Sequence, residues 1–235
     1  MATTNAVLLD ELNHLANAQF DTPEFLRLIS LPLTVHRARC YTIHMAHYVN
    51  NRRDCWGYVQ GAAPLPVKRM IWEHEREELI HDPRAGTDHA TLSAQEAGLL
   101  GVSPAEVEQA ELIPGAEAAF WAWAHLARSL PWLEAFTASS MLERRNDDAV
   151  IEGGALSARM GHKMARELGI PLERNVNATV HMAADIEHAS MLERVLEQYV
   201  TDDAAREAVR RAARLTYTVD RAFRGALAMA MEELP

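Results

Sequence analysis

The chain has 235 residues and a formal net charge of −10, from 33 acidic and 23 basic side chains. This acidic balance argues against nucleic acid and anionic membrane surfaces as partners, because both would repel the protein. The cysteines, Cys40 and Cys55, form no CxxC pair, and no secretory leader is recognisable at the N-terminus. We therefore expect two reduced thiols in a cytoplasmic protein.

Most of the sequence has the composition of α-helices, because alanine is abundant and β-branched runs are absent. Glycine and proline cluster at a few breaks, and Gly169 is expected to end one helix in the left-handed conformation. In chain order, helices are predicted over residues 6–17, 34–61, 66–81, 88–100, 104–112, 116–145 (bent near Pro131), 155–168, 171–200 and about 203–231, with a short helical turn after Thr22-Pro23.

The most apolar stretch, AAFWAWAHLARSLPWL, is interrupted by His125, Arg128 and Pro131. It is therefore predicted to be a core helix and not a membrane span. No internal repeat or shift in composition marks a second domain. These features predict one all-α helical bundle over residues 1–235.

The clearest chemical pattern is HMAADIEH, in which His181, Asp185 and His188 follow one another at spacings of four and three. At about 100° per residue these three side chains point to one side of a helix. Imidazole and carboxylate groups are ligands that iron, manganese and zinc accept. An ordinary solvated face would have the same residues, but neighbours such as Val180 and Met182 are apolar and disfavour an unpaired charge.

A second group lies in WEHEREELIHD, residues 72–82, and continues to His89. Glu78 and His81 have the Glu-x-x-His form of diiron sites in helical bundles. Asp82 and His89 flank a turn, where both side chains could face inward. Not all the acidic residues can be ligands, because they encircle the helix, and a solvated face is expected for Glu73, Glu75 and Glu77.

Two further sets of residues are weaker candidates. Glu143 follows Ser139 and Ser140, whose small side chains would leave room for a ligand, although Glu143 could equally pair with a neighbouring arginine. His44 and His47 share a helix face without a carboxylate and are expected in the core or in a substrate pocket.

Taken in order, these candidates resemble the ligand set of the heme-oxygenase-like diiron oxidases. This family includes the CADD-type proteins and is related to PqqC and to the thiaminase-type TenA proteins. The resemblance rests on a carboxylate and a histidine separated by six residues, a lone glutamate about fifty residues later, and His-x-x-x-Asp-x-x-His. As a pattern of helices it extends from about residue 20 to about residue 230, and it implies a heme-oxygenase-like bundle of about seven helices.

The resemblance implies two Fe(II) ions per chain, with O2 as co-substrate. The implied ligands are Asp82, His89, Glu143, His181, Asp185 and His188. The first carboxylate of such enzymes is commonly a glutamate, so Glu78 is the alternative to Asp82. The proposed activity is oxidation of a small, amino-acid-derived substrate by N-oxygenation, C–C cleavage or desaturation, with an external reductant as a further partner. The family also allows a homodimer.

Substrate contacts were assigned to Arg159, His47 and Ser140, and Arg37, Arg39 and Arg144 are further candidates for binding a carboxylate. The alternative to a diiron oxidase is a metal-free PqqC-like oxidase or a helical protein that binds a small molecule. A TenA-type enzyme would need a cysteine in the middle of the fold, but the chain has none after Cys55.

Overall fold

In the computed structural model, residues 4–235 are described, apart from the side chains of Thr4, residues 183–187 and Ala189. This part of the chain consists of helices joined by turns and loops, and its only strand-like pairing is an isolated bridge between Asp82 and Thr87. The α-helices are α1 (Thr4–Ala18), α2 (Pro23–Ser30), α3 (Val35–Ala62), α4 (Leu65–Leu79), α5 (His89–Leu99), α6 (Pro104–Gln109), α7 (Pro114–Ser129), α8 (Trp132–Arg144), α9 (Leu156–Leu168), α10 (Val176–Tyr199) and α11 (Asp203–Glu232).

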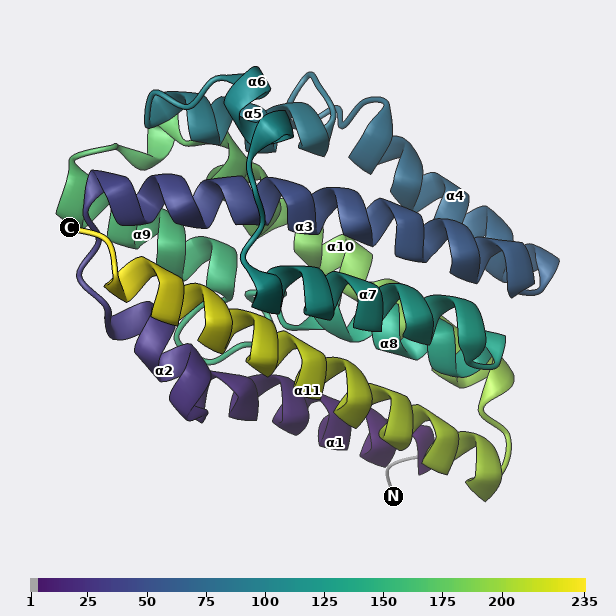
Figure 1. Ribbon diagram of the computed structural model, residues 1–235. Coiled ribbons are helices and arrows are strands. Elements are labelled where there is room, and N and C mark those ends of the chain that lie inside the picture. The colour runs from purple at the N-terminus through teal and green to yellow at the C-terminus, as the bar shows by residue number, and fades with distance from the viewer. Residues whose placement is uncertain (1–3) are drawn as a thin grey trace.

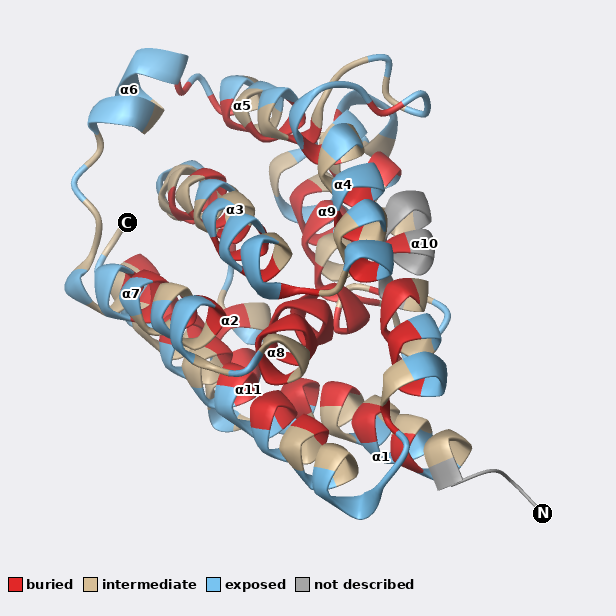
Figure 2. Ribbon diagram, turned by 90° about the vertical axis from the view of Figure 1, so that its right-hand side faces the viewer, coloured by how far each residue is buried: buried red, intermediate tan, exposed pale blue. Residues whose placement is uncertain are grey.

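The helices form a bundle around α8, which Figure 2 shows in the middle of the molecule. Every residue from Glu134 to Arg145 is buried, because α3, α7, α10 and α11 all pack against this helix. In Figure 1, α3 crosses above α7 and α8, while α11 lies below them beside α1 and α2. A helix buried on all sides can hold polar side chains only where other elements satisfy them.

The longest helices begin at side-chain caps and bury one stripe of residues. Asp202 accepts a hydrogen bond from the backbone N–H of Ala205 and starts α11, and Thr34 accepts one from Arg37 and starts α3. The buried stripe of α11 runs from Val209 through Tyr217 and Phe223 to Met231 at spacings of three and four. Packing of this stripe against α2, α7 and α8 builds the main hydrophobic core.

Several element boundaries differ from the sequence-based prediction, and α6 ends at Gln109, three residues before the predicted end. The expected helix 116–145 is two helices, because Pro131 provides no backbone N–H and holds Leu130 in an extended conformation (φ −81°, ψ 155°). Helix α4 ends at Leu79, two residues earlier than expected, and a short 3₁₀ turn, Leu172–Arg174, precedes α10. The end of α9 is as predicted, with Gly169 in the left-handed region at φ 67°.

Among the residues that the structure describes, none of the helices combines the length and the apolar character needed to cross a bilayer. The segment predicted as a core helix contributes Phe120 and Trp123 to the interior as part of α7, while Trp121 stays 79% exposed.

Candidate metal centre

Three imidazole rings converge on the carboxylate of Glu78. Oε1 of Glu78 lies 2.9 Å from Nδ1 of His89, 3.5 Å from Nδ1 of His188 and 3.9 Å from Nε2 of His74. These residues come from α4, α5 and α10, and all four are buried. The bundle thus brings one carboxylate and three aromatic nitrogens to one interior point.

The outward-facing nitrogen of each ring is held by a second carboxylate. Such a contact fixes the orientation of an imidazole and directs its other nitrogen inward, as is common around metal ions in proteins. The pairs are His74 Nδ1 with Glu75 Oε1 (2.9 Å), His89 Nε2 with Asp82 Oδ2 (2.8 Å) and His188 Nε2 with Glu77 Oε2 (3.2 Å).

Two of the inward nitrogens make no hydrogen bond of ordinary geometry. They are Nε2 of His74 and Nδ1 of His89, both buried, and the latter has only the ion-pair contact with Oε1 of Glu78. Burial lowers the pKa of His74 to about 3, so this ring is neutral at pH 7, which is the form that binds a metal. Because buried polar atoms are normally satisfied, this donor set fits a metal cation.

The donors fall into two neighbouring groups. One nitrogen from each of His74 and His188 and one carboxylate oxygen of Glu143 lie within 4.8 Å of one another, and all three residues are buried. In the other group, the rings of His89 and His181 lie 4.6 Å apart at 70°, and Nδ1 of His89 faces Glu78. The side chain of Asp185 lies outside the described residues.

The buried guanidinium of Arg53 balances part of the negative charge. Its NH1 lies 2.5 Å from Oε2 of Glu78 and 3.2 Å from Oε1 of Glu75. Burial by itself would raise the pKa of Glu78, but Arg53 and the His89 ring hold this pKa well below its ordinary value. Glu78 is therefore an anion that presents Oε2 to Arg53 and Oε1 to the imidazoles.

The positions of Asp82 and Glu78 follow from the end of α4. Glu78 is still helical, continues the buried face and reaches the centre, whereas Asp82 lies in the turn after the helix. Both oxygens of Asp82 are occupied: Oδ2 contacts Nε2 of His89, and Oδ1 accepts from the backbone N–H of Arg84 at 2.8 Å. Asp82 is thus separated from the central point by the His89 ring.

Two residues of this centre were not among the sequence-based candidates, namely His74 and Arg53. His74 had a recognisable signal, because Val67, Ile71, His74 and Glu78 follow the helical spacing of one buried stripe. Glu75 and Glu77 were expected on a solvated face. Their side chains are only 12% and 25% exposed, because each of them contacts a histidine ring.

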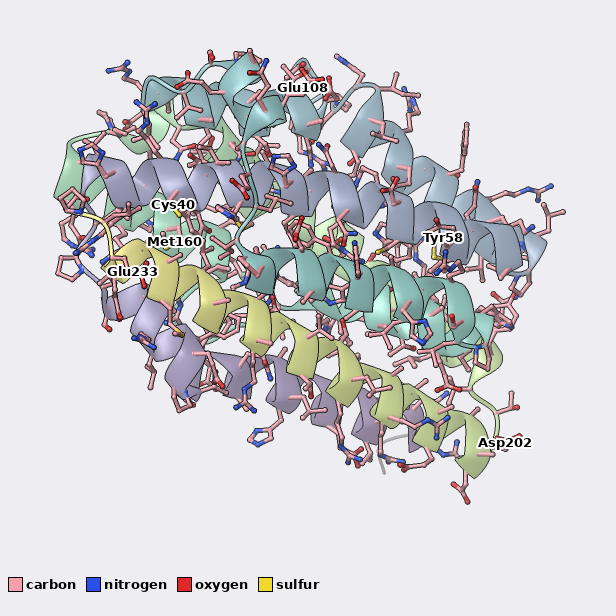
Figure 3. The ribbon with its side chains drawn as sticks, viewed as in Figure 1. Cys40, Tyr58, Glu108, Met160, Asp202 and Glu233 are labelled. Atoms are coloured by element: carbon pink, nitrogen blue, oxygen red, sulfur yellow. The ribbon has the colours of Figure 1, made fainter. Side chains whose placement is uncertain are left out.

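A cavity of about 70 Å³ adjoins the donors, and Glu78, Glu143 and His181 form part of its wall. Met160 of α9, another lining residue, is labelled in Figure 3. The polar residues in the remaining wall are Tyr41, Thr42, Tyr48, Arg52, Arg53, Ser93, Glu96, Asn146, Ser157 and Asn177. The volume is room for on the order of five water-sized groups.

The three residues expected to bind substrate lie outside this wall, so their assignment stays a prediction. His47 bonds through Nε2 to the carbonyl of Val107 at 2.8 Å, and Ser140 is fully buried within α8. Arg159 donates to the carbonyls of Gly154 and Glu152 on another surface. The helix pattern could not reveal this, because the side of α3 or α9 that faces the cavity is decided by packing.

Comparison with known proteins agrees with this architecture. The sequence pattern of a family described as iron-containing redox enzymes matches residues 39–221. A crystal structure of a domain of unknown function with a heme oxygenase-like fold, from Shewanella denitrificans, aligns with a TM-score of 0.75 at 11% identity, over 99% of this chain and 95% of that chain. The fold is therefore the heme-oxygenase-like bundle that the sequence predicted.

A CADD-like protein of unknown function from Nostoc punctiforme is also similar in structure. One crystal structure aligns with a TM-score of 0.69 at 17% identity, over 96% of this chain and 97% of that chain. A second structure of that protein gives 0.66 at 14% identity, over 97% and 96%. Comparison with curated proteins finds no match.

Proposed function

This chain belongs to the family of iron-containing redox enzymes, and from that premise we propose that it is an O2-using non-heme diiron oxidase or oxygenase. The observation that supports the proposal best is the convergence of three imidazoles on Glu78, each held from outside by its own carboxylate. In a structural ion-pair cluster the carboxylate faces cationic side chains, whereas here nitrogens of three histidine rings also face one carboxylate oxygen.

We assign the ligands from the two groups of donors. His74, Glu143 and His188 would hold one iron, since their donor atoms lie within 4.8 Å of one another. Glu78, His89 and His181 would hold the other, with Asp185 as a further ligand because its position in the sequence lies between two histidines of α10. Asp82 becomes a positioning residue for His89.

Iron in such a site supplies electrons to O2 and so allows a small molecule to be oxidised. The residues of the chain prepare the site. The outer carboxylates fix the three rings, and Arg53 keeps Glu78 ionised in a buried position. The carboxylates offset the charge of the metal, while buried side chains such as Trp56 and Phe136 limit access of water.

The substrate that we propose is small and derived from an amino acid, because the cavity beside the donors is small and has a polar lining. N-oxygenation, C–C cleavage and desaturation are the reactions to test. Where the substrate itself supplies too few electrons to reduce O2, an external reductant would supply the rest.

The test is anaerobic titration of the purified protein with Fe(II), followed by rapid mixing with O2 and optical detection. We expect two irons per chain and a transient absorption band, both of which are diminished in His181→Ala and Glu143→Ala. Failure to bind iron in a correctly folded protein would contradict the proposal and favour a metal-free oxidase or a binding protein.

A further inference from the structure

Two side chains of opposite charge line the cavity, and neither forms an ion pair with a described residue. They are the guanidinium of Arg52, on α3, which is buried, and the carboxylate of Glu96, on α5, which is half-buried. Isolated charges are costly to remove from water, so a buried charge normally has a partner of opposite sign. A ligand that carries both charges would provide the missing partners.

Arg52 is only 3% exposed and poorly satisfied. One terminal nitrogen makes a long contact of 3.4 Å with the carbonyl oxygen of Ser139, and its Nε is buried without a hydrogen-bond partner. Arg53, the next residue, differs from Arg52 because its guanidinium forms ion pairs with both Glu75 and Glu78. Arg52 is therefore the cation in this wall that is available to an anionic group, and a guanidinium binds a carboxylate well.

Glu96 is held in place without being neutralised. Its Oε1 accepts a hydrogen bond from the amide of Asn175 at 2.7 Å, and its Oε2 accepts one from the amide of Asn177 at 2.9 Å. Both donors are uncharged, so they orient the carboxylate and leave its charge uncompensated. Burial raises the pKa of Glu96, while the two amides oppose this effect.

The two charges come from different helices of the cavity wall. Glu96 is seven residues beyond His89 on α5, which is about 10 Å along the helix axis from that metal-ligand candidate. Arg52 belongs to a different helix of the wall, α3. A ligand that pairs with both residues therefore needs one anionic and one cationic group.

We propose that the cavity binds a small amino carboxylate, with Arg52 holding the carboxylate and Glu96 holding the protonated amine. This inference rests on the proposed function, since it names the substrate class of the same site. The cavity volume of about 70 Å³ limits the ligand to a small molecule.

The first experiment is isothermal titration calorimetry on the metal-free protein with a series of ω-amino acids of three to eight carbons, and with lysine. Hexanoate and hexylamine serve as probes with a single charge. We expect at least one amino carboxylate to bind roughly tenfold to a hundredfold more tightly than either probe, because each charged contact contributes separately. Absence of binding by the whole series, or equal binding of the probes, would overturn the inference.

Two substitutions separate the roles of the charges. Arg52→Gln should weaken binding of the amino carboxylate and of hexanoate by roughly tenfold to a hundredfold, without affecting hexylamine. Glu96→Gln should weaken binding of the amino carboxylate and of hexylamine, without affecting hexanoate. Arg128→Gln and Glu117→Gln are matched controls, because both residues are exposed and lie outside the cavity.

Folding is checked by circular dichroism, and Arg52→Lys restores a positive charge in the event that Arg52→Gln does not fold. Partial recovery of hexanoate binding in Arg52→Lys supports the charge role of Arg52. An equal loss of hexanoate and hexylamine binding in Arg52→Gln contradicts it. Iron uptake by Arg52→Gln and Glu96→Gln should equal that of the unmodified protein, since neither residue is an assigned ligand. Iron uptake without amino carboxylate binding would remove this inference alone, and amino carboxylate binding without iron uptake would remove the diiron proposal alone.

Discussion

Within the described residues, the buried charged side chains around Asp220 and those around Glu78 are arranged differently. In the cluster around Asp220, its Oδ2 lies 2.8 Å from Nε of Arg145 and its Oδ1 lies 3.0 Å from Nε of Arg224. The carboxylate thus bonds two guanidiniums, and Tyr48 bonds one of them. In the cluster around Glu78, three ring nitrogens instead face one carboxylate, with further carboxylates outside them.

The difference shows that burial of charge does not by itself identify a functional site. Opposite charges in contact tolerate burial because each neutralises the other, and removal of one partner destabilises the fold. Several electron-pair donors that face one another indicate a missing cation. The first arrangement predicts a role in stability and the second a role in metal binding, and the following substitutions test that division.

The largest effect is expected for Asp220→Ala, which leaves Arg145 and Arg224 buried without their carboxylate. The free energy of unfolding should fall by about 3–5 kcal/mol, as is typical when one partner of a buried ion pair is removed. Denaturant titration measures this change. Asp203→Ala is the control, because that carboxylate is exposed, and its loss should cost less than about 1 kcal/mol. A small loss of stability in Asp220→Ala would contradict the structural role.

His74→Ala is the next test and should act on metal binding. We expect the affinity for one of two irons to fall by more than about 100-fold, because a direct ligand should matter more than the outer partners of ligands. Equilibrium titration with Fe(II) under nitrogen measures the stoichiometry. His44→Ala is the matched control, since His44 is also buried but bonds the backbone of Ile113. Two tightly bound irons in His74→Ala would exclude His74 as a ligand.

Asp82→Asn should have an intermediate effect through His89. The asparagine can still accept a hydrogen bond from Nε2 of His89 but no longer supplies the negative charge that strengthens the ring as a donor. Iron affinity should fall by roughly 10- to 100-fold, as for other outer partners of metal-binding histidines. Iron titration gives the value, and Asp88→Asn, at the half-buried N-cap of α5, is the control. A loss as large as that of Glu78→Gln would indicate that Asp82 binds metal directly.

The smallest effect is expected for Glu167→Gln and depends on pH. The backbone N–H of Leu33, Lys163 and Arg166 donate to this carboxylate and lower its pKa to about 2, although burial opposes the shift. Its stabilisation is thus complete above the unfolded pKa of about 4.5 and is lost as the pH falls towards 2. The contribution should be about 1 kcal/mol or less, because Glu167 lies partly in water.

Thermal unfolding of Glu167→Gln and of the unmodified protein at pH 7 and pH 3 measures that dependence. The difference in melting temperature should shrink at the lower pH, where the unmodified carboxylate loses its advantage. An equal difference at both pH values would assign the effect to lost hydrogen bonds and not to charge.

Several features of this protein were readable from its residues because they depend on local periodicity. The spacing of His181 and His188 places both on one side of α10, and Gly169 ends α9 as its conformational freedom predicts. The same rule predicts an inward-facing His74, because it belongs to the buried stripe that begins at Val67, although His74 was not among the candidate ligands. The alternation of apolar stripes and caps likewise predicted a helical bundle.

Contacts between distant helices were not readable in this way. Whether Glu78 or Asp82 faces the centre depends on where α4 ends, and the role of Arg52 or Arg53 depends on how α3 packs against α5 and α8. The sequence by itself determined the helices and most of the groups able to bind a metal, because these follow from the 3.6-residue period and from side-chain chemistry. Only the tertiary structure decided which groups meet, because the pairing of side chains far apart in the chain is set by the packing of the whole bundle.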